Sequence, residues 1–120
     1  AIKLDSLIGQ YYCNRALAKG NKKDFNGAIK DIKKSIDLEP SNALFYFYSG
    51  TIKYRKEDYQ GALLDYNKAI ELQPDYPEAF YDRGLTKNIL MDKNGACIDW
   101  NKARDLGDKD ADDLIMENCK

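Results

Sequence analysis

The sequence repeats itself every 34 residues. The clearest marks of this period are three aspartates, each followed three residues later by a Gly-Ala pair: Asp24, Asp58 and Asp92. The same spacing continues through Asp31, Asp65 and Asp99, then Lys34, Lys68 and Lys102, then Leu38, Leu72 and Leu106, with Pro40 and Pro74 after the first two copies. Periods of this length are typical of arrays in which each copy is one supersecondary unit. The period predicts a single domain over residues 1–120, with repeats at 9–42, 43–76 and 77–110.

Each repeat is predicted to be a helical hairpin. In the second copy, apolar and small residues recur at helical spacing in two blocks, first Tyr46, Gly50 and Tyr54, and then Tyr59, Ala62, Leu63, Tyr66, Ala69 and Ile70. The repeated aspartate before the second block is suited to cap a helix, and Pro40 and Pro74 are suited to end one. Small residues mark the points where the two helices of a hairpin approach each other: Ala16, Gly50 and Gly84, with Ala28, Ala62 and Ala96.

The last ten residues predict one more helix. Ala111, Leu114, Ile115 and Cys119 fall on one face of it, so a capping helix at about 109–119 would seal the core beside the last hairpin. Asp108 or Asp110 is expected to cap this helix. The chain begins at Ala1 rather than Met, from which we expect that its natural start lies upstream.

The repeats resemble the tetratricopeptide repeat. The resemblance rests on Tyr46 to Gly50, Asp58 to Ala62, Tyr66, Lys68 to Leu72 and Pro74, and on the matching residues of the third copy, Phe80 to Gly84, Gly95, Ala96, Trp100 and Leu106. It covers about 100 of the 120 residues. It implies an all-α fold, a right-handed superhelical solenoid of three antiparallel helix pairs plus one capping helix. It also implies a protein-protein interaction module that acts as a scaffold or adaptor.

Composition argues against several other classes of function. Nineteen Lys and Arg against 20 Asp and Glu give a net charge of −1, which disfavours nucleic acid as a partner. The sequence contains no apolar run of about 18 residues, so no membrane span is expected. It also lacks His, and no serine lies in a nucleophile motif. We therefore expect no enzyme activity, no catalytic residues, no metal and no cofactor.

Carboxylates occur in two patterns that could suggest chemistry. The run from Asp105 to Asp113 has the spacing of a calcium loop but lacks its Gly and its final Glu, so helix capping is the better interpretation. The repeated aspartates Asp31, Asp65 and Asp99 each precede a Lys by three residues. They are interpreted as solvated ion pairs on the helix surface.

Two of the three cysteines are candidates for a disulfide. Cys97 lies ten residues before Gly107 and Cys119 twelve after it, so a chain reversal there would bring them to a similar level. The alternative is two buried thiols packed as small apolar groups. The compartment stays open: cytoplasmic or, if Cys97 and Cys119 are bridged, periplasmic or otherwise extracytoplasmic.

The family resemblance implies a concave groove lined by the first helix of each repeat. Helical phase assigns three rows of side chains to it: Gln10, Cys13, Asn14, Leu17 and Asn21; then Leu44, Phe47, Tyr48, Thr51, Tyr54 and Arg55; then Glu78, Tyr81, Asp82, Leu85, Asn88 and Ile89. The alternative for the aromatic members is that they pack against one another across neighbouring repeats.

A well-known subset of the family grips the C-terminal carboxylate of chaperones with Lys, Asn and Arg. The corresponding positions here are Cys13, Leu17, Tyr48, Glu78 and Asp82, which supply no cation. We therefore expect another partner, an apolar or aromatic-anchored peptide with a basic end near Glu78 and Asp82. The alternative function is self-association, through Leu4, Leu7 and Ile8 and the open end of the first hairpin.

Overall fold

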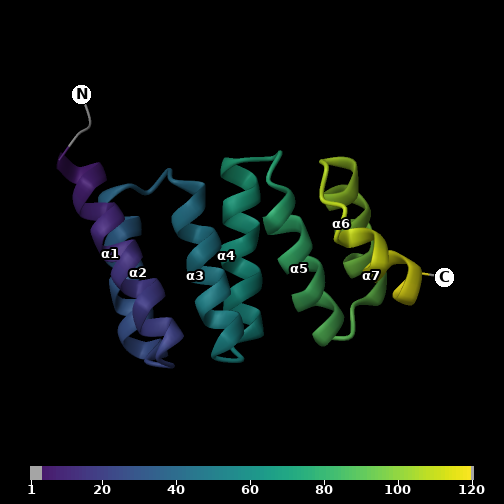
Figure 1. Cartoon of the computed structure of the whole chain (residues 1–120), viewed down its shortest axis with the longest axis horizontal. Helices are drawn as coiled ribbons and strands as arrows, with labels where there is room; N and C mark the ends of the chain where they lie inside the picture. The colour runs from purple at the N-terminus through teal and green to yellow at the C-terminus, as the bar shows by residue number, and fades with distance from the viewer. Residues whose placement is uncertain (1–3, 120) are drawn as a thin grey trace.

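The computed structural model describes residues 4–119, and all regular secondary structure in that range is α-helical. Its helices are α1 (Leu4–Asn21), α2 (Phe25–Leu38), α3 (Ala43–Arg55), α4 (Tyr59–Leu72), α5 (Pro77–Ile89), α6 (Lys93–Asp105) and α7 (Ala111–Asn118). The helices form sequential antiparallel pairs, α1 with α2, α3 with α4 and α5 with α6, followed by α7 packed on α6 (Figure 1). The array measures 48 × 32 × 19 Å. Its sequential antiparallel pairs confirm the predicted all-α superhelix of stacked hairpins.

The second helix of every hairpin starts on the predicted aspartate cap. The side chains of Asp24, Asp58 and Asp92 accept hydrogen bonds from the backbone N–H three residues on, at 3.1, 3.0 and 2.9 Å. That position is Gly in each copy, and a Cβ atom there would lie less than 2.5 Å from the capping carboxylate. The last helix differs: the side chain of Asp110 makes no cap hydrogen bond, whereas Asp108 accepts one from the N–H of Asp110 at 3.0 Å.

Two glycines let the helices of a hairpin approach closely. A Cβ atom on Gly50 would lie 2.8 Å from the ring of Tyr66, and one on Gly84 would lie 2.5 Å from the indole nitrogen of Trp100. Both rings are almost completely buried, and the predicted small partners Ala28, Ala62 and Ala96 have no exposed surface. In these two hairpins, a large aromatic side chain of the second helix therefore packs directly against a glycine of the first helix.

The interpretation of the repeated aspartates as solvated ion pairs is wrong. Asp31 and Asp99 are 4% and 1% exposed, and their partners lie on the other helix of the hairpin. Arg15 and Lys19 contact Asp31 at 2.8 and 3.0 Å, and Lys53 contacts Asp65 at 3.0 Å. The hydrogen bond from Arg15 lowers the pKa of the Asp31 carboxyl to about 2. These ion pairs therefore link the two helices of a hairpin and do not lie on the surface of a single helix.

No helix within the described chain combines the length and the hydrophobicity needed to span a lipid bilayer.

Candidate functional site

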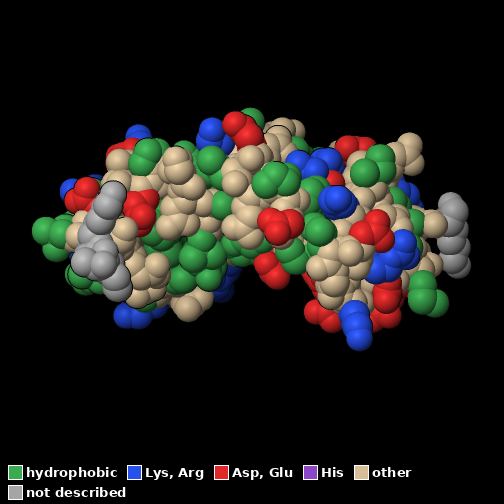
Figure 2. All heavy atoms as spheres, turned by 90° about the horizontal axis from the view of Figure 1, so that it is seen from above, with side chains coloured by type: hydrophobic (Ala, Val, Ile, Leu, Met, Phe, Trp, Pro, Cys, Tyr) green, Lys and Arg blue, Asp and Glu red, His purple; other side chains and the backbone are tan. Residues whose placement is uncertain are grey.

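A pocket lies between α3, α4 and α5, near the middle of the array. It has a volume of about 230 Å³. Figure 2 shows a hollow at the lower edge of the molecule, midway along its length, where hydrophobic side chains gather to the left and acidic ones to the right. Six residues line the pocket, and all but Tyr66 belong to the predicted groove: Thr51, Tyr54, Arg55, Tyr66, Asp82 and Leu85.

Hydrogen bonds orient two of the pocket hydroxyl groups. The Thr51 hydroxyl lies 3.1 Å from the backbone carbonyl of Phe47, to which it donates, and 3.1 Å from the Tyr66 hydroxyl. A hydroxyl group has only one proton, so the Tyr66 O–H must donate to Thr51. Burial raises the pKa of Tyr66, which keeps its hydroxyl neutral. Neither hydroxyl has a proton left to offer to a ligand, but the Tyr66 oxygen can still accept a hydrogen bond.

Asp82 supplies the charge of the pocket. Within residues 4–119 no side chain donates a hydrogen bond to its carboxylate or lies within ion-pair distance of it, although the residue is half-buried. Burial, together with smaller contributions from the nearby carboxylates of Asp108 and Glu78, raises the pKa of this carboxyl to about 6. Asp82 is thus a partly desolvated carboxylate without a compensating cation.

Arg55 also lines the pocket, but its guanidinium is engaged on the side of the first repeat. Its Nη1 donates to the side chain of Asn21 at 3.2 Å, and the guanidinium carbon lies 5.8 Å from the centre of the Phe25 ring. The arginine therefore bridges the first and second repeats. Its guanidinium is held on the side of α1, and in the described part of the chain no ion pair joins it to Asp82.

The other predicted groove residues divide into exposed and packed ones. Asn14, Leu44 and Glu78 are exposed, and Asn88 is half-buried. Leu17, Phe47, Tyr48 and Tyr81 are half-buried against the hydrophobic core clusters. Phe47 packs on Tyr76, Tyr48 and Tyr66 with ring centres 5.1, 5.6 and 5.8 Å apart, so the alternative of aromatic packing describes Phe47 well.

Sequence reasoning misplaced two residues of the face. Cys13 is wrong as a groove residue because its side chain has no exposed surface, and burial raises the pKa of its thiol to about 11. Tyr66 was predicted only as an apolar position of a second helix, and it is 1% exposed, but its hydroxyl end reaches the pocket. The available signal was Gly50, since the missing side chain on α3 is what lets the Tyr66 ring cross to the face of the first helices.

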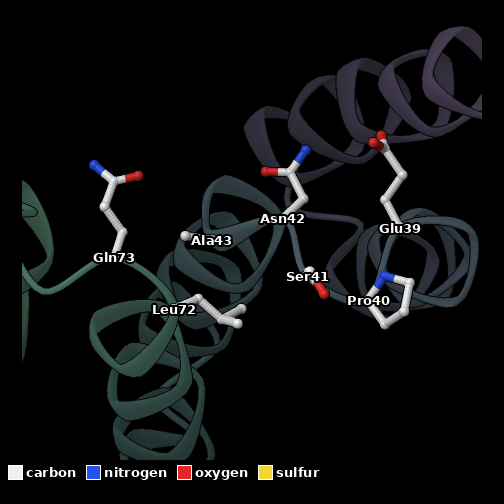
Figure 3. A pocket seen from close by; sticks show the side chains of 7 residues that line it. All are labelled: Glu39, Pro40, Ser41, Asn42, Ala43, Leu72 and Gln73. Atoms are coloured by element: carbon white, nitrogen blue, oxygen red, sulfur yellow. The ribbon is translucent and has the colours of Figure 1, made fainter. Parts of the chain in front are cut away.

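A larger hollow of about 530 Å³ lies where α2, α3 and α4 end or begin (Figure 3). Two of its polar side chains make hydrogen bonds within the chain. Glu39 accepts a hydrogen bond from Ser6 at 3.1 Å, and Asn42 caps α3 by accepting from the N–H of Leu44 at 3.0 Å. The hollow is therefore explained by helix ends that meet at an open surface.

The disulfide candidates lie together at the end of the array. Cys97 of α6 is joined to Cys119, which directly follows α7, with a distance of 5.8 Å between the Cα atoms. The pair sits against the cluster around Trp100, into which Leu114 and Ile115 of α7 also pack. The bond therefore ties the end of the chain to the last hairpin.

The stacked hairpins with a pocket on the face of their first helices define a helical-repeat protein. Two family models match, one for the tetratricopeptide repeat at residues 9–42 and one for the TPR repeat at residues 50–87. Neither describes a catalytic family, and together they cover more than half of the chain. The chain belongs to the tetratricopeptide repeat family. A comparison with curated proteins gives no match.

Solved structures share this fold at low sequence identity. The chain is 22% identical to the Arabidopsis OM64 TPR domain, over 90% of this chain and 91% of that one, with a TM-score of 0.85. It is 20% identical to the first TPR of Spaghetti (RPAP3) bound to the HSP90 peptide SRMEEVD, over 98% and 94% of the chains, with a TM-score of 0.88. MamA is 21% identical, over 82% of this chain and 58% of that one, with a TM-score of 0.77.

Proposed function

We propose that this chain is a non-catalytic interaction module that binds a segment of another protein in the groove lined by α1, α3 and α5. The observation that carries the proposal is the Asp82 carboxylate, which lies partly desolvated and unpaired in the wall of an aromatic pocket. Burying an unpaired charge destabilises a fold, and such departures from local stability are typical of binding sites.

The rows beside the pocket supply contact surface for a polypeptide. Leu44 is 37% exposed, and Tyr48, Tyr54 and Tyr81 are half-buried, so each presents part of its ring to solvent. Tyrosines of this kind suit interfaces because a large rigid ring loses little conformational entropy on binding. The groove therefore suits a peptide that is anchored by apolar or aromatic side chains.

The same residues argue against the C-terminal carboxylate of a chaperone as the partner. The peptide of the Spaghetti complex, SRMEEVD, has two Glu and ends in Asp, and a carboxylate of this kind needs cations or amides as donors. Here Cys13 is buried, Leu17 and Tyr48 carry no charge, and Glu78 and Asp82 would repel an acidic end. We therefore place an apolar peptide with a basic end in this groove.

Affinity capture from the native source tests the proposal. The unmodified chain is compared with a Tyr48→Ala, Tyr81→Ala double variant and with a Leu64→Ala, Ile98→Ala control, whose side chains are 70% and 69% exposed on the second helices. We expect a protein that is retained by the unmodified chain and the control but lost from the groove variant. Purified, this protein must bind the groove variant at least about tenfold more weakly.

The thermal melting of all three chains serves as the folding control in this experiment. An identical catch from the folded groove variant and the unmodified chain would overturn the groove as the binding site. A groove variant that melts far below the control would show that the two tyrosines are core residues instead.

A second candidate function, self-association, is favoured by a separate observation. Leu4, Leu7 and Tyr11 are 68%, 55% and 58% exposed and follow one another at helical spacing along α1. In an array, the outer face of a first helix is where another hairpin can stack. If copies associate through this face, the mass in solution rises with concentration, and a Leu4→Lys, Leu7→Lys variant stays monomeric.

A further inference from the structure

The pocket between α3, α4 and α5 has the size of one side chain. Its volume of about 230 Å³ lies below the range of about 300–1,000 Å³ that is usual for small-molecule sites. It opens on the same face as the exposed parts of Leu44 and Tyr48, so a polypeptide lying there could insert one residue. The chemistry of the walls then decides which residue.

Apart from Arg55, the pocket walls combine apolar surface with hydrogen-bond acceptors. Tyr54 and Tyr66 contribute rings and Leu85 contributes an aliphatic wall. Tyr54 is held edge-on against Tyr59 with ring centres 5.5 Å apart, which fixes its position. The protons of Thr51 and Tyr66 are committed to acceptors inside the protein, so the Tyr66 oxygen and the Asp82 carboxylate must be met by donors from the ligand.

The surroundings of the pocket are negative on the side of α5. Glu78 lies one helical turn before Asp82, and Asp108 acts on Asp82 from the loop between α6 and α7. A further hollow of about 440 Å³ beside them is lined by Glu78, Asp108 and Asp110, with Lys109 as its one cation. Arg55 lines the same pocket and keeps its positive charge, since Asn21 is a neutral amide, but the hydrogen bond to Asn21 holds its guanidinium on the side of α1. A cationic group is therefore drawn to the Asp82 end.

Between the two cationic side chains, the geometry favours lysine. An arginine is best bound where two oxygens in one plane accept from its fork, as Asp31 and Asp99 do elsewhere in this chain. The pocket adds to the Asp82 carboxylate of α5 a second, separate acceptor on α4, the Tyr66 oxygen, and lines the space with apolar surface. A lysine has an apolar stem for the rings and a compact ammonium group with three donors. Aromatic faces add cation–π attraction for the same group.

From this geometry we infer that the pocket receives a lysine side chain of the bound polypeptide, its stem between Tyr54, Tyr66 and Leu85 and its ammonium group on Asp82. The inference rests on the proposed function and names the partner class: a segment with an apolar or aromatic anchor and a lysine beside it. The ammonium group would supply the ion pair that Asp82 lacks in the free protein.

Two small probes test the pocket without a known partner. Nα-acetyl-lysine amide carries the proposed side chain, and Nα-acetyl-norleucine amide has the same stem without the charge. Both are titrated into the ¹⁵N-labelled chain, and the amide signals of Thr51, Asp82 and Leu85 are followed by NMR. We expect the lysine probe to bind at least about tenfold more tightly than the norleucine probe, as a charge-assisted hydrogen bond requires.

Two variants then test whether the Asp82 carboxylate binds the ammonium group of the lysine probe. Asp82→Asn should weaken the lysine probe about tenfold, whereas the control Asp37→Asn, which removes an exposed carboxylate on α2, should leave its affinity unchanged. Equal binding of the two probes, no shift at these amides, or an unchanged affinity in Asp82→Asn would each overturn the inference. An Nα-acetyl-arginine amide probe that binds more tightly than the lysine probe would overturn the choice of lysine. The comparison of probes on the unmodified chain needs no variant to fold.

This experiment and the capture experiment fail independently. If capture yields a groove-dependent partner but the lysine probe does not bind, the proposed function stands and the lysine pocket is wrong. If the probe binds at Asp82 but no partner depends on the groove, the pocket stands as a cation site and the proposed function is wrong.

Discussion

Arg83 donates two hydrogen bonds to Asp99 across the last hairpin, from Nε at 2.8 Å and from Nη2 at 2.7 Å. Lys87 lies 3.1 Å from the same carboxylate, whose side chain is 2% exposed. The arrangement recurs in the first repeat, where Arg15 and Lys19 hold Asp31. In the second repeat Ser49 takes the place of the arginine and donates to Asp65 at 2.6 Å. The network is thus a part of the repeat that crosses from its first helix to its second.

Asp99→Asn should lower the free energy of unfolding by about 3 kcal/mol, because removing one partner leaves the cations of Arg83 and Lys87 without their buried counter-charge. Urea unfolding followed by circular dichroism measures the loss. The matched control is Asp105→Asn, which removes a carboxylate that is 65% exposed and 3.8 Å from its nearest cation. This control should change stability by less than about 0.5 kcal/mol. Similar losses in both variants would contradict the assigned role.

Asp82→Asn should stabilise the chain at pH 7. The pKa of Asp82 is raised in the folded state to about 6, so the folded protein binds the proton more tightly than the unfolded one. The fold therefore becomes less stable as the pH rises from about 4 through 6, because the carboxyl loses its proton in that range. It faces Glu78 on its own helix, Asp108 from the following loop and the phenols of Tyr54 and Tyr66. We expect a gain on the order of 1–2 kcal/mol at pH 7 that vanishes below about pH 4.

Urea unfolding of Asp82→Asn and of the unmodified chain at several pH values measures this difference. A gain in stability together with weaker binding of the lysine probe would show that Asp82 contributes to binding while it lowers the free energy of unfolding. A loss of stability at pH 7 would instead show that the carboxylate has a structural partner.

Reducing the Cys97–Cys119 bond should lower the melting temperature. The bond closes a loop with a sequence separation of 22, for which chain-entropy arguments give a stabilisation of about 3 kcal/mol. Thermal melts with and without dithiothreitol measure the change. A Cys97→Ser, Cys119→Ser variant should melt like the reduced chain and not respond to the reductant. If the reductant lowers its melting temperature as well, the effect does not come from this bond.

Met91→Gly should stabilise the chain. Met91 links α5 to α6 with a φ of 69°, in the left-handed region that costs an L-residue about 1–2 kcal/mol, and its side chain is 89% exposed. Glycine relieves that strain but loses more backbone entropy on folding, which leaves a net gain of about 0.5–1 kcal/mol. The control Met116→Gly replaces a 71% exposed methionine inside α7 and should destabilise instead. Chemical denaturation of the two variants gives the signs.

The sequence predicted the hairpin array and its helix starts well. Asp58, for example, caps α4 as expected. Capping was predictable because it depends only on residues three positions apart in the sequence. The roles of the repeated aspartates were not predictable in this way. Asp99 precedes Lys102 by three residues, but its partners are Arg83 and Lys87, one helix earlier. Spacing along one helix cannot show which residues of the other helix face it.

The candidate site likewise contains some features that were predicted from the sequence and others that only the packed structure decided. The family resemblance implied the groove, and helical phase then placed Thr51, Tyr54 and Asp82 on its face, because phase is a property of consecutive residues. Only the packed structure brought the Tyr66 hydroxyl through the gap at Gly50, buried Cys13 and turned Arg55 toward Asn21, leaving Asp82 unpaired. These outcomes depend on how closely neighbouring helices approach and how far each is rotated. Side-chain volumes across the whole core decide both, and no local pattern encodes them.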